Sequence, residues 1–270
     1  MKIIRNILMA ALLVFAVSGY SYAGKVVVEG STTVLPIAQR AAEVFMDKNR
    51  GADISIRGGG SSVGIASLLD GTCDIADASR AIKSSELEKA VTNGIDPVSH
   101  VVAMDGIAVI VNSSNKISRL SKDQIKDIYT AKIKDWSELG GTPGKIVVIS
   151  RDSSSGTYEA FGELVLKGQK VRPDALLQAS NQAVASTVER TPQAMGYVGL
   201  GYITDSVKAL EVNGVMPSKD TVLSGKYPVS RPLFMYTNGS PKGAVKEFLD
   251  FIKSSEGQLL VDQEGFVALK

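Results

Sequence analysis

A short polar stretch, RDSSSGTY (Arg151 to Tyr158), follows directly after the apolar run KIVVIS. It places an arginine, an aspartate, three consecutive serines, a glycine and a threonine where a buried strand is expected to end. Two kinds of chemistry use these residue types. A serine hydroxyl becomes a nucleophile when a base activates it, whereas hydroxyl and backbone N–H groups together bind an anion. The stretch therefore indicates either a serine nucleophile or an anion-binding loop.

Two further loops, EGSTTVLP and RGGGSSVG, have a similar composition. Each of the three loops occurs where a strand is expected to lead into a helix, and a helix N-terminus offers partial positive charge and unsatisfied donors. In open α/β sheets such loops lie at the carboxyl ends of strands, where ligands bind. Serine and threonine are also ordinary helix caps, so one loop alone favours capping. Three loops, with Arg80 and Arg151 close to them in sequence, favour an anion site.

The sequence offers little support for a serine nucleophile. His100 is the only histidine, and its surroundings, PVSHVVAMDG, carry no hydrolase signature. SSSGT does not match G-x-S-x-G, and RGGGSSVG matches neither G-x-G-x-x-G nor a P-loop. A lysine base stays open, although no S-x-x-K occurs at the serine loops. We therefore interpret the serines as hydrogen-bond donors.

The elements that must position these loops follow from the hydrophobic pattern. Strands are expected at KVVVEG, ISIRGG, CDIADAS, DGIAVIVN, KIVVIS, GYVGL and RPLFMYT, and helices at VLPIAQRAAEVFMDKN, SVGIASLLDG, SKDQIKDIYT, TYEAFGELVL and PKGAVKEFLDFIKSSEG. The alternation predicts an α/β fold with mixed, mostly parallel sheets and helices on both faces. DGIAVIVN breaks the rhythm, so two lobes are expected, with two crossover strands near residues 104–107 and 226–232.

The N-terminus has the layout of a secretory signal. Lys2 and Arg5 precede an apolar stretch from Ile7 to Val17, and small residues at Ser21 and Ala23 predict cleavage after Ala23. The apolar stretch is shorter than the ~20 residues that a spanning helix needs. The expected signal peptide is residues 1–23, and the mature protein is expected to be exported and soluble.

Composition limits the function classes further. The whole chain carries a formal charge of +2, and removal of Lys2 and Arg5 with no acid leaves the mature chain without net charge. This balance does not favour nucleic acid or a membrane surface as partner. Cys73 is the only cysteine, so an internal disulfide is impossible, and a zinc site built from histidine and cysteine is not expected.

Taken in order, EGSTTVLP, GGGSSVG, DIADASR, MDGIAVIVN, RDSSSGT and QAMGYVGLGY resemble the loops of the phosphate-binding proteins of bacterial ABC phosphate importers, the PstS family. The resemblance covers essentially the whole mature chain. It implies a two-lobed periplasmic binding protein that closes on dehydrated phosphate and delivers it to a membrane transporter. It also implies lobe I at 24–105 and 228–270, lobe II at 106–227, no catalysis, no metal and no organic cofactor. The expected partners are inorganic phosphate and the permease subunits of an importer, and a monomer is expected.

By resemblance, the phosphate ligands come from both lobes. Arg80 and Arg151 could each donate charge-assisted bonds to phosphate oxygens, although a surface salt bridge is the alternative for either arginine. The expected set is Ser31, Thr32, Thr33, Val34, Ser61, Ser79 and Arg80 from the first lobe, Asp105 at the crossover, and Arg151, Ser154, Ser155, Gly156 and Thr157 from the second lobe.

The sequence departs from the family's better-known branch at two positions. Where that branch has aspartates that accept the proton of hydrogen phosphate and repel sulfate, this chain has Ser79 and Ser153. A hydroxyl both accepts and donates, so it discriminates less well. Asp105 is the preferred replacement, with Asp77 and Asp152 as further candidates and a turn role for Asp105 as the alternative. A binder of another tetrahedral oxyanion, such as sulfate, and a secreted serine hydrolase or phosphatase stay open as alternatives.

Overall fold

The computed structural model describes residues 24–269. The expected signal peptide, residues 1–23, lies outside these residues. None of the helices in the described part of the chain is long and apolar enough to cross a bilayer.

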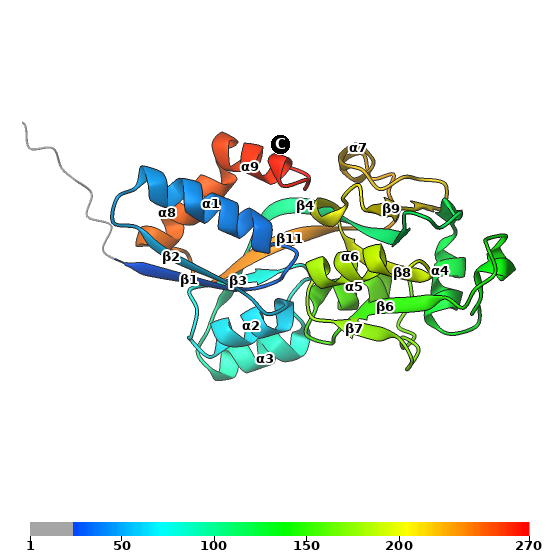
Figure 1. Ribbon diagram of the computed structural model, residues 1–270. Helices are drawn as coiled ribbons and strands as arrows, with labels where there is room; N and C mark the ends of the chain where they lie inside the picture. Colours follow the sequence, from blue (N-terminus) through cyan, green and yellow to red (C-terminus); the bar gives the residue numbers. More distant parts are fainter. Residues whose placement is uncertain (1–23, 270) are drawn as a thin grey trace, which may run out of the picture.

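The first half of the fold is a parallel strand arrangement with helices on both faces (Figure 1). Strand β1 (Lys25–Gly30) pairs in parallel with β2 (Asp53–Gly58) and β3 (Ile75–Ala78). Alternate side chains of β1 are buried, as expected for a strand whose two faces are covered differently. Helices α1 (Leu35–Lys48), α8 (Gly243–Lys253) and α9 (Ser255–Gln263) cover one face, and α2 (Ser61–Leu69) and α3 (Ser84–Thr92) cover the other.

One long strand, β4 (Pro97–Asn112), belongs to both halves of the molecule. Up to Gly106 it pairs antiparallel with β11 (Ser230–Asn238), which in turn pairs with β3. From Ile107 it pairs antiparallel with β8 (Ala194–Gly199), and its end pairs with β9 (Val207–Ala209). The strands therefore form one hydrogen-bonded path, β2-β1-β3-β11-β4-β8-β6-β7, in which β4 changes its pairing partner after Gly106.

The second half continues from β8 to β6 (Val147–Arg151) and the edge strand β7 (Leu176–Gln178), all parallel to one another. Helix α6 (Asn181–Arg190) packs on β8, β6 and β4. Helices α4 (Lys122–Tyr129), α5 (Gly156–Leu164) and α7 (Lys219–Leu223) complete this half, together with the short β5 (Arg119–Leu120) and β10 (Glu211–Val212) and the 3₁₀ turns η1 (Trp136–Leu139) and η2 (Leu200–Tyr202).

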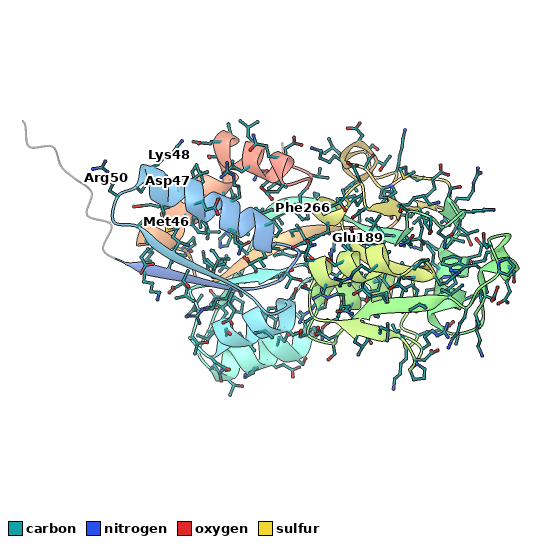
Figure 2. The ribbon with its side chains drawn as sticks, in the orientation of Figure 1. Met46, Asp47, Lys48, Arg50, Glu189 and Phe266 are labelled. Atoms are coloured by element: carbon teal, nitrogen blue, oxygen red, sulfur yellow. The ribbon has the colours of Figure 1, made fainter. Side chains whose placement is uncertain are left out.

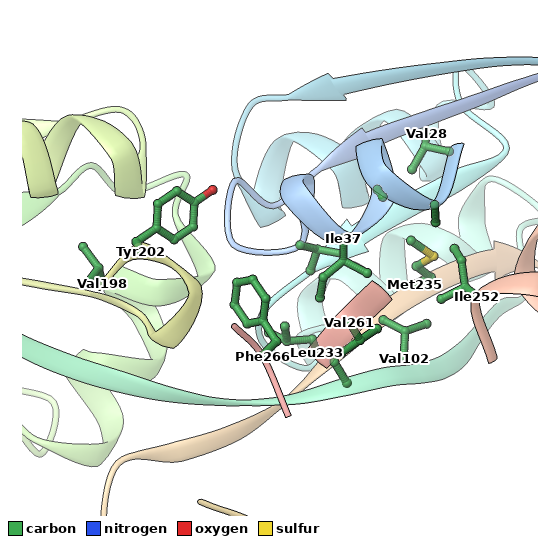
Figure 3. Packing of buried hydrophobic residues seen from close by; sticks show 14 of the residues in the cluster. Val28, Ile37, Val102, Val198, Tyr202, Leu233, Met235, Ile252, Val261 and Phe266 are labelled. Carbon is green, nitrogen blue, oxygen red and sulfur yellow. The ribbon is translucent and has the colours of Figure 1, made fainter. Parts of the chain in front are cut away.

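Buried apolar side chains connect the halves. Figure 3 shows part of the largest cluster, in which Ile37 of α1, Leu233 of β11 and Phe266 pack together, with Tyr202 of η2 at its border. Two further clusters lie within the second half and between β3 and helices α2 and α3. The largest cluster contains side chains from both halves, so the hydrophobic core is continuous across the interface between them.

The mixed α/β fold class is as predicted, but several elements differ from expectation. The strand expected from Asp105 begins at Pro97, because PVSHVVAM pairs with β11 along its length. Helices α3, α6 and α7 and the short strands β5, β7, β9 and β10 were not predicted. The single C-terminal helix is two helices separated at Ser254, whose extended backbone and hydroxyl cap the second one.

Candidate anion site between the lobes

The three Ser- and Gly-rich loops lead from strands into helices, as the sequence predicts. Ser31–Val34 connects β1 to α1, Gly59–Gly60 connects β2 to α2, and residues 152–155 connect β6 to α5. Ser155 is the N-cap of α5, where its Oγ accepts a hydrogen bond from the N–H of Tyr158 at 3.2 Å. Pro36 lies in the first turn of α1, where its missing N–H has no cost. Three helix N-termini therefore converge.

Residues from the two halves meet at close range. Thr33 Oγ1 lies 2.9 Å from Thr157 Oγ1 across the interface. Ser61 Oγ accepts from the Ser79 N–H at 3.0 Å, and the two hydroxyl oxygens are 3.3 Å apart. A Cβ on Gly156 would lie 2.3 Å from Ser61 Oγ, so only glycine permits this approach. All five residues are buried.

Arg151 is a buried cation without a carboxylate partner in the described part of the chain. Its side chain is 1% exposed, and it donates from Nε to the Gln178 carbonyl at 3.0 Å and from Nη2 to the Ala179 carbonyl at 2.9 Å. Burial lowers the pKa of Arg151, the charge of the adjacent Asp152 partly opposes this, and the charge of Arg231 lowers the pKa further. A buried charge is costly unless it is paired, so this position favours an anion.

Arg231, at the start of β11, is a site residue that sequence reasoning missed. Its Nη2 donates to Asp105 Oδ2 at 3.0 Å and to Thr157 Oγ1 at 3.0 Å, and its Nη1 donates to the Ser79 carbonyl at 2.9 Å. Burial lowers the pKa of Arg231 and raises that of Asp105, while their ion pair acts in the opposite direction on each. The sequence signal that could have revealed it is an arginine at the start of the apolar segment RPLFMYT, which was expected to be a strand.

Asp105 is completely buried at the site, as its place at the crossover suggested. Its Oδ1 accepts from the Leu200 N–H at 2.9 Å, and its Oδ2 accepts from Arg231. Both oxygens thus have protein partners, and the carboxylate offsets the charge of Arg231. Its expected role as acceptor of a phosphate proton stays a prediction.

Asn181, the first residue of α6, also lies at the interface and was missed because its helix was missed. It is fully buried, and its Nδ2 donates to Thr33 Oγ1 at 3.0 Å and to Thr32 Oγ1 at 3.2 Å. Its Oδ1 accepts from the Gly199 N–H at 3.2 Å. Tyr202 donates from its hydroxyl to the Thr32 carbonyl, and Figure 3 shows that hydroxyl directed toward the loop before α1.

Arg80 forms ion pairs with two acids, which is the alternative that the sequence left open for it. Its Nη1 donates to Glu86 Oε2 and the Ala81 carbonyl, and its Nη2 donates to Glu86 Oε1 and Ser62 Oγ. Its Nε lies 2.8 Å from Glu159 Oε2. Four of the five N–H donors of the guanidinium thus have hydrogen-bond acceptors, and Nε is within ion-pair distance of Glu159 without forming a hydrogen bond among the described residues. Burial lowers the pKa of Arg80, but its hydrogen bonds and ion pairs with Glu86 and Glu159 raise the pKa overall.

The backbone of the first loop is also more occupied than expected. The Thr33 N–H donates to Ser31 Oγ at 3.1 Å, and the Val34 N–H donates to the Ser31 carbonyl at 3.1 Å. Ser154 faces the other lobe, because its Oγ lies 3.1 Å from the Gly59 carbonyl oxygen and its own carbonyl accepts from the Ser62 N–H at 3.0 Å. Ser31 and Ser154 thus shape the loops, and Val34 contributes a buried side chain beneath them.

Asp77, Asp152 and Ser153, the other residues considered for anion selectivity, differ in burial and in hydrogen bonding. Asp77 is 1% exposed, neither of its oxygens has a hydrogen-bond partner among the described residues, and burial raises its pKa well above the ordinary value. Asp152 Oδ1 accepts from the N–H and hydroxyl of Ser154. Ser153 is exposed. Within residues 24–269, none of the three forms a hydrogen bond with Thr33, Ser61 or Thr157.

The only imidazole of the chain does not activate a site serine. His100 Nε2 lies 2.9 Å from Thr237 Oγ1, and burial lowers its pKa. Thr237 is on β11, seven residues beyond its start and away from the serine loops. A serine–histidine pair is therefore absent from residues 24–269.

Comparison with known proteins places the chain in a family. Residues 18–256 match the model of the PBP superfamily domain. The chain is 36% identical over 249 residues to the phosphate-binding protein PstS of Bacillus subtilis, which covers 90% of this chain and 80% of that protein. It is 33% identical over 253 residues to PstS of Borreliella burgdorferi, covering 89% and 88% respectively.

Solved structures agree with this relationship. A Clostridium perfringens protein described as a phosphate ABC transporter substrate-binding protein, with bound phosphate, superposes with a TM-score of 0.86 at 36% identity over 92% of this chain and 100% of that one. An ABC-type phosphate transport receptor of Vibrio cholerae gives 0.74 at 30% identity over 90% and 100%. The chain belongs to the PstS family of phosphate-binding proteins, within the PBP superfamily.

Proposed function

We propose that this protein captures inorganic phosphate between its lobes and delivers it to an ABC importer. The observation that carries the proposal is the buried guanidinium of Arg151, which has no ion-pair partner among the described residues. Its charge interacts with Arg231 and Tyr202, which contact the Thr157 hydroxyl and the Thr32 carbonyl respectively. A phosphate there would replace the missing counter-charge and accept hydrogen bonds from the hydroxyls. The proposed ligands are Thr32, Thr33, Ser61, Ser79, Arg151, Ser155, Gly156 and Thr157.

Arg231 and Asp105 would hold the ligand-binding residues in position without being ligands themselves. Arg231 holds Thr157 Oγ1 and the Ser79 carbonyl, and Asp105 keeps the guanidinium in place. One of the two buried cations, Arg151, is then available for the anion, whereas the charge of the other is offset. The net positive charge of the pocket suits an oxyanion, and its hydroxyl lining replaces the water that phosphate loses.

The remaining parts of the proposal concern the setting. The signal-like residues 1–23 support export to the periplasm, and PstS relatives are named as binding proteins rather than enzymes. We propose a monomer that hands phosphate to permease subunits without catalysis. We also propose that lobe I comprises residues 24–105 and 228–270 and lobe II residues 106–227, a division supported by the change of strand partner within β4.

Isothermal titration of ligand-free protein, first with phosphate and then with sulfate, tests this function. The proposal expects saturable binding of one phosphate per chain without release of product. No heat with phosphate, or turnover of a phosphate ester, would contradict it. Stoichiometric labelling of Ser155 by a fluorophosphonate would instead support a serine hydrolase.

A specific observation also keeps sulfate as a second candidate ligand. Ser79 and Ser153 replace the aspartates of the better-known branch, and both oxygens of Asp105 already accept hydrogen bonds from protein. A site without a free carboxylate has weaker means to repel sulfate. Equal affinities for the two anions in the same titration would change the proposed ligand from phosphate to tetrahedral oxyanions in general.

A further inference from the structure

Asn181 is held in one orientation, so its hydrogen-bonding polarity is known. A backbone N–H can only donate, and that of Gly199 donates to the Asn181 side chain at 3.2 Å. The atom facing Gly199 must therefore be the amide oxygen. The amide nitrogen then faces Thr32 Oγ1 and Thr33 Oγ1, and its two protons suffice for one bond to each. Asn181 thus donates across the interface to both threonines.

This donation determines where the hydroxyl proton of Thr33 goes. Thr33 Oγ1 receives Asn181 Nδ2 at 3.0 Å and, at the longer distance of 3.4 Å, Arg231 Nη2. Neither group can accept a hydrogen bond, and a hydroxyl oxygen has two lone pairs. Because Nη2 carries only two protons, and Asp105 Oδ2 and Thr157 Oγ1 accept them at 3.0 Å, Thr33 shares one of them at most. Thr157 Oγ1, at 2.9 Å, is the one neighbour of the Thr33 hydroxyl among the described residues that can accept, so the proton of Thr33 is directed to it.

The same reasoning extends to Thr157. Its Oγ1 receives the proton of Thr33 and also Arg231 Nη2 at 3.0 Å, which fills its acceptor capacity. The described residues provide no further hydrogen-bond partner for the Thr157 hydroxyl. Its proton is therefore left to donate to whatever occupies the site.

We infer that Asn181 is a positioning residue that orders the chain Asn181 → Thr33 → Thr157 and so makes the Thr157 hydroxyl an obligatory donor to the bound anion. The inference rests on the proposed function. It implies that an unprotonated oxygen of hydrogen phosphate faces Thr157, because a protonated oxygen there would set two donors against each other. Asn181 itself need not touch the anion.

A double-mutant cycle tests this role. Asn181→Ala, Thr157→Val and the double variant are titrated with phosphate, and each ligand-free protein is unfolded thermally. Asn181→Ala alone is expected to weaken phosphate binding about tenfold, the size of a hydrogen bond to a charged group. In the Thr157→Val background the same change should cost less than about twofold, since the donor that it orients is absent. Additive losses would overturn the inference.

The chain provides a matched control in Asn112. It is also buried, and it anchors the other end of α6 by donating from Nδ2 to the carbonyls of Val188 and Glu189, the latter labelled in Figure 2. Asn112→Ala should lower the unfolding temperature but leave phosphate affinity unchanged. An equal affinity loss in this variant would mean that Asn181 acts only by stabilising α6, which would contradict the inference.

Asn181→Asp provides a second variant that preserves the Gly199 contact. It replaces the donor facing the threonines with an acceptor, so the proton chain is reversed and the affinity loss should exceed that of Asn181→Ala. An affinity equal to or higher than that of the alanine variant would contradict the inference. If the wild type itself binds no phosphate, the proposed function fails instead. If the wild type binds and the cycle is additive, only the role of Asn181 fails.

Discussion

Arg151 combines deep burial with the absence of an ion-pair partner among the described residues, so its position is unfavourable without an anion. Its two carbonyl contacts hold the guanidinium in place without offsetting its charge. Arg80 and Arg231 differ, because each forms an ion pair with a buried or half-buried acid. Of the three arginines near the interface, Arg151 is therefore the one that gains most from a bound oxyanion.

Arg151→Ala is expected to cost at least about 2 kcal/mol of phosphate binding, because the anion loses a desolvated charge partner. Arg151→Lys should recover only part of this loss, since a lysine lacks the forked donor geometry. Titration calorimetry measures both values. Arg172 is a suitable control, because it is also buried but is paired with Asp174. Arg172→Ala should affect stability but not affinity, and unchanged affinity in Arg151→Ala would refute the assignment.

Asp105→Asn tests the selector role. If the carboxylate accepts the proton of hydrogen phosphate, the variant should lose phosphate affinity and show a smaller gap between phosphate and sulfate. If it serves only Arg231, ligand-free stability should fall, because removing one partner of a buried pair costs about 3–5 kcal/mol, while the ratio of affinities stays constant. Paired titrations with both anions and urea unfolding separate these outcomes.

Asp77 predicts a pH dependence of stability. Burial raises its pKa in the folded state, and its oxygens lack partners among the described residues. A carboxyl whose folded-state pKa is raised favours the folded state below its unfolded pKa, near 3.9, and this stability is lost as pH rises toward the folded pKa. Asp77→Asn resembles the protonated acid, so its unfolding temperature should increasingly exceed that of the wild type as pH rises.

The control for Asp77→Asn makes the same charge change at an exposed site. Asp47, on α1 and labelled in Figure 2, is exposed. Asp47→Asn should show no such divergence from the wild type between acid and neutral pH. A constant difference between Asp77→Asn and the wild type across this range would mean that Asp77 is ionised at little cost in the folded protein.

Sequence reasoning identified the loops of the site more readily than its supporting residues. Ser61, Arg151 and Thr157 belong to Ser- and Gly-rich loops at helix N-termini, which local composition reveals. Arg231 and Asn181 each arrive from an element distant in sequence, and only strand pairing and helix packing bring them to the loops. The ion pairs of Arg80 were left open as an alternative by the sequence, and its partner Glu159 is distant in sequence, so only the fold brings the two together.

At the scale of elements, α5 and the segment before α3 are joined by ion pairs across the interface. Glu159, on the first turn of α5, lies 2.8 Å from both Arg80 Nε and Lys83 Nζ, and Ser62 donates to it at 3.3 Å. The side chains of Arg80 and Glu159 are only 7% and 13% exposed, so solvent screens their pair weakly. These contacts connect the two halves and should favour the closed arrangement.

Glu159→Gln should therefore speed the release of phosphate, with about a tenfold increase in dissociation rate and little change in association rate. Stopped-flow measurement with a fluorescent reporter separates the two rates. Glu163, one turn further along the same helix, is exposed and forms no ion pair among the described residues. Glu163→Gln is thus the charge-matched control, and equal dissociation rates in the two variants would contradict the role of Glu159.

Helices and strands could be predicted from the sequence where a hydrophobic pattern within the segment itself indicates the element. Strands β1, β2 and β6 alternate or run apolar between turn residues, and α1 carries a clear apolar face. The first part of β4 was missed because its sequence, PVSHVVAM, includes a proline and a histidine and becomes a strand through its pairing with β11. The break between α8 and α9 depends on one capping serine, Ser254, within a continuous helical pattern.

At the scale of the whole molecule, the two lobes are in a closed arrangement. They contact each other at Thr33 and Thr157, at Thr32 and Asn181, and at Gly59 and Ser154. Phosphate bound between them should favour this arrangement. The radius of gyration from small-angle scattering is expected to decrease when phosphate is added to ligand-free protein. The unfolding temperature should rise as well, corresponding to about 2.7 kcal/mol at a phosphate concentration 100 times the dissociation constant. Identical scattering curves with and without phosphate would contradict closure.

The position of β11 has a consequence for how the chain reaches its native state. This strand lies between β3 and β4, yet it begins at Ser230, long after both have been synthesised. The half of the sheet that contains β1 and β3 is therefore incomplete until the last segment is available, whereas β6, β7 and β8 with α6 come from one contiguous stretch. Because distant pairings form more slowly than local ones, the half that is central in the sequence should acquire its structure first. The half formed by both ends should follow, and the anion site, which needs both, should form last.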